Sequence, residues 1–335
     1  MIVVGAGIIG LSCAWRLAQR GIGVTVFDAR EAAREASWAG AGMLAPGGEF
    51  DTPSRLAHMA LESLAMYPEF VRELQKESGI DIDFRRSGAV EVAFDDSEAD
   101  ALQSRSARQA EIGIRSEPCI HDGRAARFYP DDAVVDPRDV TAALLIACKA
   151  RGVSIREHEP VLEISASGRS VRTSMGDYAA EGVAVAAGAW SSSLIQGSPR
   201  TMPIRGHLVS WNLAPGVLDP ILRHGHTYLL QRRSGTLIAG ATSERVGFNR
   251  EIDERAISDL RTRAGALLPS LRGLAPSECW NGFRPGIEAE APAVGRVPGA
   301  SLWQAFGHYR NGILLAPETA RRVADEMAGL LDAQG

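Results

Sequence analysis

Residues 2–28 read IVVGAGIIGLSCAWRLAQRGIGVTVFD, which is an apolar run, a glycine-rich turn, a helix-like segment and a second apolar run. The side chains at residues 2–4 are β-branched, as in buried parallel strands, and the apolar residues after the turn recur at helical spacing. Residues 24–27 predict another strand, which ends at Asp28. We interpret this stretch as a β-α-β unit that opens an α/β fold.

The turn has the spacing G-x-G-x-x-G, with its glycines at Gly5, Gly7 and Gly10. Such glycines allow a tight turn, a close approach of the backbone to a pyrophosphate, and close packing of the helix on the strand. The helix N-terminus offers unpaired N–H groups to the phosphates. Asp28 follows Gly10 by 18 positions, close to the roughly 20 expected for a carboxylate that binds a ribose. The pattern predicts a dinucleotide site; alone it fits FAD, NAD or a purely structural turn.

The composition excludes several functional classes. The chain has 335 residues and a formal net charge of −5. Its basic residues form no run longer than a pair, so nucleic acid is not an expected partner. The longest apolar stretch, residues 2–15, is interrupted by glycines, lacks a basic leader and is too short to cross a bilayer. We therefore expect no membrane anchor and a cytoplasmic location.

The four cysteines are far apart and form no C-x-x-C pair, which argues against a zinc site and against a redox pair. Free thiols in a reducing compartment are the expectation. His224 and His226 lie near each other, but no third ligand is apparent, so we expect no metal. The cysteines are Cys13, Cys119, Cys148 and Cys279.

The rest of the chain alternates helical and strand-like segments without a repeat or a low-complexity linker, so any domains must be interleaved. Helical periodicity is followed by a terminal glycine or proline in several segments. Pro68 predicts a break or kink in the first of them. Helices are predicted over residues 54–78, 95–112, 136–152, 252–268 and 311–331. Strands are predicted over residues 87–94, 153–155, 161–164, 170–174 and 182–186, and in an antiparallel sheet over 203–240 that includes 208–211, 227–230 and 236–239.

Four further motifs carry a family resemblance. They are ASWAGAGMLAP at residues 36–46, AGAW at 187–190, the stretch from Trp280 through the RPG of 284–286, and GHYRNGILLAP at 307–317. With the N-terminal turn, they resemble the FAD-dependent amino-acid and amine oxidases of the D-amino-acid oxidase group, most closely the bacterial glycine oxidases of thiamine biosynthesis. The likeness spans essentially the whole chain.

The resemblance implies an α/β architecture: a discontinuous Rossmann-like FAD-binding domain and an interleaved α+β substrate domain built on an antiparallel sheet. We expect the first to comprise residues 1–80, 134–198 and 282–335, and the second residues 81–133 and 199–281. Some relatives bind the flavin to a cysteine, but none lies in residues 307–317, so non-covalent FAD is expected. The expected FAD-binding residues are Gly5, Gly7, Ile8, Ile9, Gly10, Asp28, Ala29, Ala36, Ser37, Ala41, Gly42, Met43, Val161, Gly188, His308, Tyr309, Arg310, Asn311, Gly312, Ile313 and Leu314.

The resemblance also implies a substrate site. Arg284 matches the arginine that binds the substrate carboxylate, for which a guanidinium has the right paired donors. Tyr228 matches a tyrosine above the flavin, and Arg310 matches a second position that contacts substrate through side chain or backbone. The alternatives are a surface ion pair for Arg284 and a core packing role for Tyr228. His308 is expected to form part of the flavin wall and not to act as a general base.

The implied activity is oxidative deamination of glycine or another small amino acid to a 2-oxo acid, ammonia and hydrogen peroxide, with oxygen as acceptor. Ser243 stands where such oxidases usually carry methionine, Ala45 replaces a frequent glycine, and residues 288–292 replace an Asp-Gly-x-Pro turn; these departures put strict glycine specificity in doubt. The alternatives are a D-amino-acid oxidase or dehydrogenase of broader specificity, an NAD-linked dehydrogenase, and a non-catalytic flavin sensor. Relatives commonly form homo-oligomers.

Overall fold

The predicted β-α-β unit forms the middle of a parallel sheet. Strand β1 (Ile2–Val4) pairs in parallel with β2 (Thr25–Phe27) on one side and with β13 (Val183–Val185) on the other. Helix α1 (Ile8–Gln19) connects β1 to β2, because parallel neighbours need a crossover connection. The computed structural model describes residues 1–332. The predicted α/β class is confirmed.

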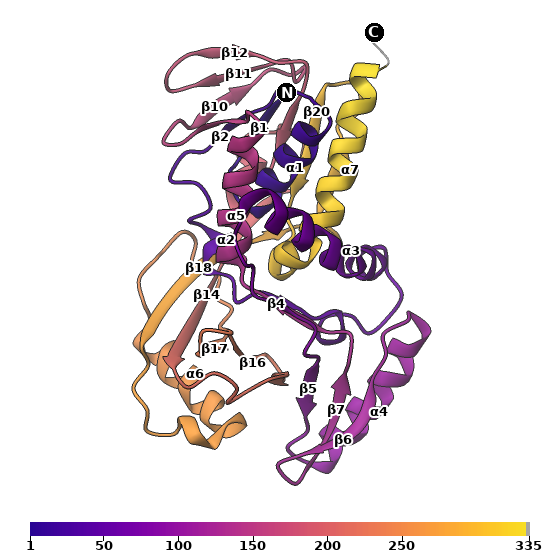
Figure 1. Cartoon of the computed structure of the whole chain (residues 1–335), viewed down its shortest axis with the longest axis vertical. Coiled ribbons are helices and arrows are strands. Elements are labelled where there is room, and N and C mark those ends of the chain that lie inside the picture. Colours follow the sequence, from indigo (N-terminus) through magenta and orange to yellow (C-terminus); the bar gives the residue numbers. More distant parts are fainter. Residues whose placement is uncertain (333–335) are drawn as a thin grey trace.

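The complete sheet has six strands in the order β19-β20-β13-β1-β2-β9, and only β19 runs antiparallel to its neighbour. Helix α1 packs between α5 and α7, and α3 packs against the same two helices. Figure 1 shows this half at the top of the molecule. Its other elements are β9 (Ser154–Arg156), β19 (Ala293–Arg296), β20 (Leu302–Phe306), α3 (Arg55–Ser78), α5 (Pro137–Ala150) and α7 (Gly312–Asp332).

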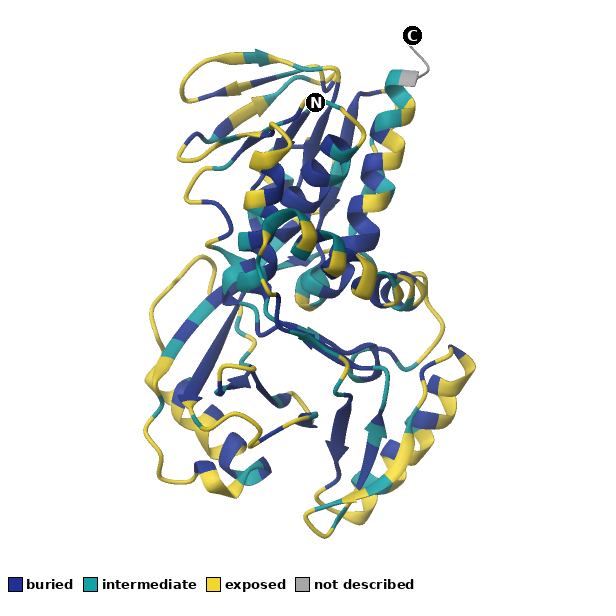
Figure 2. Ribbon diagram, viewed as in Figure 1, coloured by how far each residue is buried: buried dark blue, intermediate teal, exposed yellow. Residues whose placement is uncertain are grey.

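Strand β1 is buried on both faces, which explains its uninterrupted apolar sequence. Val3 belongs to the core beneath the helices, whereas Ile2 and Val4 belong to a second core on the opposite face. That face is covered by a three-stranded antiparallel sheet, whose Val161 and Val171 contribute to the second core. Figure 2 shows the central strands buried and the outer helix faces exposed. The small sheet consists of β10 (Val161–Ile164), β11 (Ser170–Thr173) and β12 (Asp177–Ala179).

The lower half is built on an eight-stranded sheet in which all neighbours are antiparallel except β15 and β5. Helix α6 (Glu254–Leu267) places Ile257 and Leu260 in an apolar cluster with strand residues, and α4 (Asp96–Glu111) lies along β7. The sheet order is β18 (Glu278–Ile287), β14 (Thr201–Asn212), β17 (Thr236–Gly240), β16 (Thr227–Gln231), β15 (Ile221–His224), β5 (Ala89–Val92), β7 (Arg124–Tyr129) and β6 (Glu117–His121).

A second small sheet, in the order β3-β8-β4, lies between the two halves in Figure 1. Arg232, at the end of β16, reaches this region and donates to the Val135 carbonyl at 2.6 Å. The remaining elements are β3 (Met43–Leu44), β4 (Phe84–Arg85), β8 (Ala133–Val135), α2 (Ala36–Ala39), η1 (Pro46–Gly48), η2 (Gly188–Ser193), η3 (Pro269–Leu271) and η4 (Tyr309–Asn311).

Four of the predicted helices begin with a capping side chain. Ser54, Asp95, Asp136 and Asp253 each accept a hydrogen bond from a backbone N–H in the first turn of α3, α4, α5 and α6. Such a side chain satisfies one of the N–H groups that the helix itself leaves unpaired. Each of these four helices therefore begins one residue after its capping residue. The predicted bounds of the four helices agree with the observed bounds to within two residues at either end.

The structure departs from the sequence expectations at Pro68 and in several strands that were not predicted, among them β6, β7, β18, β19 and β20. Of the break or kink predicted at Pro68, the break is wrong, since α3 continues from Arg55 to Ser78. The missing proline N–H removes one hydrogen bond, whereas packing of Leu64, Phe70 and Leu74 in the core holds the helix on both sides. Strand β18 was not predicted, because its central Gly-Phe-Arg-Pro-Gly sequence has none of the usual strand alternation.

The two-domain division stays a prediction. Its expected segment 282–335 includes residues 333–335, which lie outside the described residues.

Gly42 has a conformation and surroundings that only glycine tolerates. Its φ is +90°, and a Cβ atom would lie 1.9 Å from the Val135 carbonyl oxygen. The Val135 N–H donates to the Gly42 carbonyl at 2.9 Å, so neither backbone can retreat without breaking the β3–β8 contact.

We predict that Gly42→Ala lowers the free energy of unfolding by about 3 kcal/mol or more, because strain and a backbone clash add. Gly21→Ala is the matched control: its φ is +75° with no atom within 4 Å of the added Cβ, so it should cost only about 1–2 kcal/mol. Urea unfolding measures both. Equal losses would contradict the role of the Val135 contact.

Candidate active site

One cavity of about 610 Å³ is lined by residues from both large sheets. It takes in the N-terminal glycine turn, the end of β2, and the segments after β13 and β20. From the lower half it takes in parts of β14, β15, β16 and β18. Most of the expected site residues therefore converge on a single space, although they come from distant parts of the sequence.

The three glycines of the turn occupy different environments. Gly5 has φ +103°, and its Cβ would lie 2.4 Å from the Ala186 carbonyl oxygen. A Cβ on Gly10 would lie 1.9 Å from the Gly5 carbonyl oxygen, so Gly10 serves the packing of helix on strand and does not line the cavity. Gly7 lines the cavity at the N-terminus of α1. The backbone thus leaves open the approach that a pyrophosphate would need.

Asp28 stands at the end of β2 with its carboxylate fixed by the backbone. Its Oδ2 accepts from the Ala6 N–H at 2.7 Å and its Oδ1 from the Arg30 N–H at 2.9 Å. Burial raises the pKa of Asp28 above its ordinary value, while these two N–H groups act in the opposite direction. The carboxylate is therefore held at the cavity with lone pairs left for further donors.

Ser37 ties the segment at residues 36–43 to the glycine turn. Its hydroxyl oxygen accepts from the Ile8 N–H at 2.9 Å, in the first turn of α1. The side chain therefore caps part of the helix from outside the helix sequence, and it brings the cavity-lining residues Ala41, Gly42 and Met43 beside α1. The family resemblance implies that this segment binds the flavin, but neither the resemblance nor the sequence pattern predicted the contact with Ile8.

The segment after β20 contributes another helix N-terminus, because α7 begins at Gly312, one residue after the predicted start. Buried His308 contacts the Thr319 hydroxyl through Nε2 at 3.0 Å, and burial lowers its pKa to about 3. It is therefore neutral near pH 7 and lacks the pKa of a working base. Leu314 is 1% exposed within the core and does not line the cavity. All other expected FAD-binding residues except Gly10 do line it.

Arg284 projects from β18 across the neighbouring strand β14. A Cβ on Gly206 would lie 2.1 Å from its Nη1, so this glycine makes room for the guanidinium. Nη1 donates to the Thr242 carbonyl at 3.0 Å. Within residues 1–332 Arg284 forms no ion pair, which argues against the surface ion pair considered above. Its charge is available to a ligand in the cavity.

Thr242 is held by buried polar groups of β14 that sequence reasoning missed. The His207 N–H donates to Thr242 Oγ1 at 2.8 Å, and His207 Nδ1 lies 2.9 Å from Glu244 Oε1. The Asp253 N–H donates to His207 Nε2 at 3.2 Å, so Nδ1 carries the ring proton and donates to Glu244. The sequence pattern of polar residues along a strand does not predict these contacts.

Tyr228 lies on β16 beside Gly240 of β17, where a Cβ would come within 2.2 Å of the tyrosine oxygen. Burial raises the pKa of its hydroxyl, which finds no hydrogen-bond partner among the residues that the structure describes. Arg310 lines the same cavity, but its Nη2 donates to Glu49 Oε1 at 2.6 Å. The two arginines predicted to contact substrate therefore differ: the charge of Arg310 is already paired with Glu49, whereas Arg284 has no carboxylate partner among residues 1–332.

The histidine pair does not form a shared site. His224 contacts Glu98 of α4 at 3.0 Å, whereas exposed His226 lines the cavity. Among the described residues, no group of three metal-binding side chains comes together. The four cysteines are unpaired; two of them, Cys13 and Cys148, are buried.

Comparison with known proteins identifies the family. A family model described as "FAD dependent oxidoreductase" matches residues 1–326. The chain belongs to this family. It is 34% identical to a glycine oxidase of Bacillus licheniformis, covering 98% of this chain and 92% of that protein. It is 33% identical to a glycine oxidase of Bacillus subtilis, covering 97% and 91%.

The structures agree as well. The glycine oxidase of Geobacillus kaustophilus superposes with a TM-score of 0.93 at 31% identity, covering 98% of this chain and 94% of the other. The protein is therefore an FAD-dependent oxidoreductase, which decides between the two cofactors that the glycine turn left open. Over residues 1–332, none of the helices combines the length and the apolar character needed to cross a membrane.

We predict that Asp28→Ala weakens FAD binding about 10- to 100-fold, the loss expected for hydrogen bonds to a charged acceptor. Turnover at saturating FAD should stay within about twofold, since the glycine-turn pattern predicts that Asp28 binds the adenosine ribose and not the reacting ring. Titration of apoprotein with FAD measures the affinity. Asp28→Asn, which keeps the shape, separates this loss from misfolding. An unchanged FAD affinity would rule out the ribose role.

Proposed function

We propose that this FAD-dependent oxidoreductase oxidises glycine or another small amino acid to a 2-oxo acid and ammonia, with oxygen reduced to hydrogen peroxide. One observation carries the proposal: the half-buried guanidinium of Arg284 faces the family's cofactor cavity without a carboxylate partner among residues 1–332. A buried unpaired charge is costly unless a ligand compensates it. The carboxylate of an amino acid would do so through two parallel hydrogen bonds.

The residues around the cavity fit FAD. Gly7 and the N-terminus of α1 would hold the pyrophosphate, Asp28 the ribose, and Val161 would lie on the adenine side. The start of α7 at Gly312 would place the positive end of a helix near the pyrimidine part of the ring, where it favours negative charge. Bound FAD would supply the acceptor for the hydride of the substrate α-carbon, and oxygen would take up the electrons.

The protein's own contribution in this reaction is orientation. Arg284 would fix the carboxylate, and Tyr228 would add a hydroxyl donor, so that the α-carbon has one orientation in the cavity. Neutral His308 contacts Thr319 and has no free role in proton transfer. The substrate therefore has to enter with an unprotonated amine, and water then hydrolyses the imino acid.

Ser243 widens the proposed substrate range. It is exposed at the cavity, and its Oγ lies 3.3 Å from the Tyr309 hydroxyl. A serine leaves more space than the usual methionine and adds a polar group. We propose that sarcosine and small D-amino acids are accepted beside glycine.

We further propose a cytoplasmic location, supported by four cysteines that form no disulfide. The other expectations from the resemblance, a two-domain division, homo-oligomers and a role in thiamine biosynthesis, belong to the same proposal. A non-catalytic flavin sensor would be yellow but would produce no peroxide with any amino acid.

We predict that Arg284→Ala retains FAD but lowers kcat/KM for glycine by about 10³-fold or more, because the charge that binds the carboxylate is lost. Arg284→Lys keeps the charge without the paired donors, so its kcat/KM for glycine should lie between those of the parent and of Arg284→Ala. Anaerobic mixing with glycine, followed by flavin bleaching, measures the reductive step, and a peroxide-coupled screen of glycine, sarcosine, alanine and proline measures the range. Unchanged bleaching in Arg284→Ala would remove this residue from the site.

A further inference from the structure

Three guanidinium groups line the substrate part of the cavity, and only one lacks a counter-charge. Arg223 pairs with Glu91 at 2.9 Å and with Asp132 at 2.7 Å. Arg310 pairs with Glu49 at 2.6 Å. Arg284 has no carboxylate partner among residues 1–332. Of the three, Arg284 is therefore the one guanidinium that is left for the carboxylate of a ligand.

Glu49 belongs to a loop that is fixed from the lower half of the molecule. The Gly47 carbonyl accepts from Arg105 at 3.1 Å and from Gln109 at 2.9 Å, both on α4. The Gln109 amide also donates to the Phe50 carbonyl at 2.9 Å. The ends of the loop are thus attached to a helix, so the position of Glu49 does not depend on Arg310 alone.

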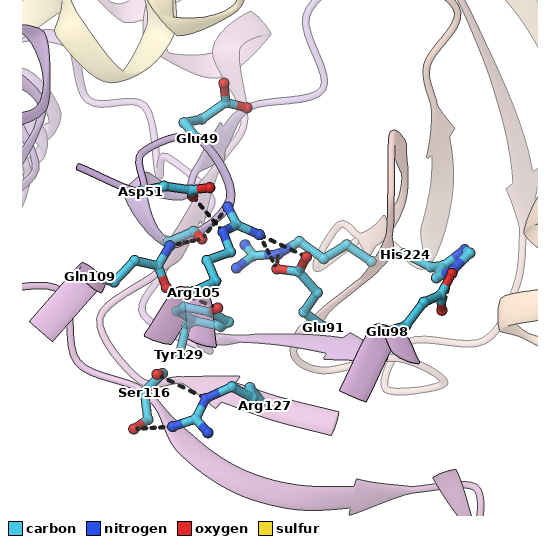
Figure 3. Close-up of polar contacts among 12 residues, drawn as sticks. Glu49, Asp51, Glu91, Glu98, Arg105, Gln109, Ser116, Arg127, Tyr129 and His224 are labelled. Atoms are coloured by element: carbon cyan, nitrogen blue, oxygen red, sulfur yellow. Dashed lines mark hydrogen bonds and ion pairs between the residues drawn. The ribbon is translucent and has the colours of Figure 1, made fainter. Parts of the chain in front are cut away.

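The two carboxylates of this loop are directed differently. Figure 3 shows Asp51 turned toward Arg105, whereas Glu49 stands apart from that cluster. Asp51 Oδ1 accepts from Arg105 Nε at 2.5 Å. Glu49 is 13% exposed and lines the cavity, and its partner Arg310 is 38% exposed. Asp51 therefore helps to hold the loop on α4, whereas Glu49 faces the cavity.

We propose that Glu49 is a specificity-determining residue that restricts the enzyme to amino acids with one carboxylate. By pairing with Arg310 it leaves only Arg284 for an acid group. A second carboxylate on the substrate would meet a like charge at Glu49 and no free guanidinium, and like charges in contact are strongly disfavoured. The inference rests on the proposed function, because it takes the ligand of Arg284 to be an amino-acid carboxylate.

The same arrangement accounts for the two ways in which Arg310 could contact substrate. Its side chain is directed to Glu49 by two hydrogen bonds, from Nε and from Nη2. The contact with an amino acid would then be made by the backbone of residue 310, next to the positive φ of Tyr309. The guanidinium would become a substrate contact only after Glu49 is neutralised.

The test compares Glu49→Gln with the parent flavoprotein in two assays. Binding of acetate and malonate, followed by the flavin absorbance, reports the acid site without turnover. Oxidation of glycine, D-aspartate and iminodiacetate reports specificity. We expect the malonate-to-acetate affinity ratio, and the kcat/KM ratio of at least one diacid to glycine, to rise about tenfold or more. Glu49→Ala should shift both ratios in the same direction, and it replaces Glu49→Gln if that variant loses FAD.

Two control variants make the result specific. Asp51→Asn removes the other carboxylate of the loop and should leave both ratios unchanged. The double variant Glu49→Gln with Arg310→Met should not show the rise in the two ratios, since it lacks the Arg310 guanidinium that Glu49→Gln leaves unpaired. Unchanged ratios in Glu49→Gln, or an equal rise in Asp51→Asn, would overturn the proposal. Failure of the parent to oxidise any of these amino acids would instead overturn the proposed function, and the malonate and acetate affinities would still decide the role of Glu49.

Discussion

A guanidinium without a counter-ion is the constraint on which the site depends. Arg284 is half-buried, so its charge has lost part of its hydration without gaining a carboxylate from residues 1–332. Proteins avoid such charges unless a ligand compensates them. The free energy lost in leaving Arg284 unpaired is recovered when an anion binds. The unpaired guanidinium therefore favours binding of an anionic ligand in the cavity.

Keeping Arg284 unpaired requires that nearby carboxylates are engaged elsewhere. Glu91 and Asp132 are held by Arg223, and Glu49 by Arg310. Glu244, two residues beyond the carbonyl that Arg284 contacts, is held by Arg205 and His207. Hydrogen bonds from Thr242, Arg205 and His207 lower the pKa of Glu244 despite its burial. Each of these carboxylates is paired with an arginine, so none of them is left as a free counter-charge for Arg284.

The local parts of this arrangement could be predicted from the sequence, and the long-range parts could not. The glycine turn, Asp28 and the start of α7 are properties of contiguous segments, where spacing and propensity determine the conformation. The pair of Glu49 and Arg310 joins residues 261 positions apart, and the contact of Arg284 with Thr242 depends on a strand, β18, without strand-like sequence. Loop geometry and strand order determine such contacts, and single-sequence patterns carry no information on either.

The same groups explain why the proposed chemistry needs no base from the protein. A general base must be unprotonated and free to accept, with a pKa near the working pH. Burial lowers the pKa of His308 to about 3, so this imidazole is neutral but too weak a base. Burial also raises the pKa of the Tyr228 hydroxyl. Neither side chain therefore exchanges protons readily near neutral pH. Glu49 is already engaged by the guanidinium of Arg310. Proton loss from the substrate amine therefore falls to the solvent before binding, and the protein supplies position and charge.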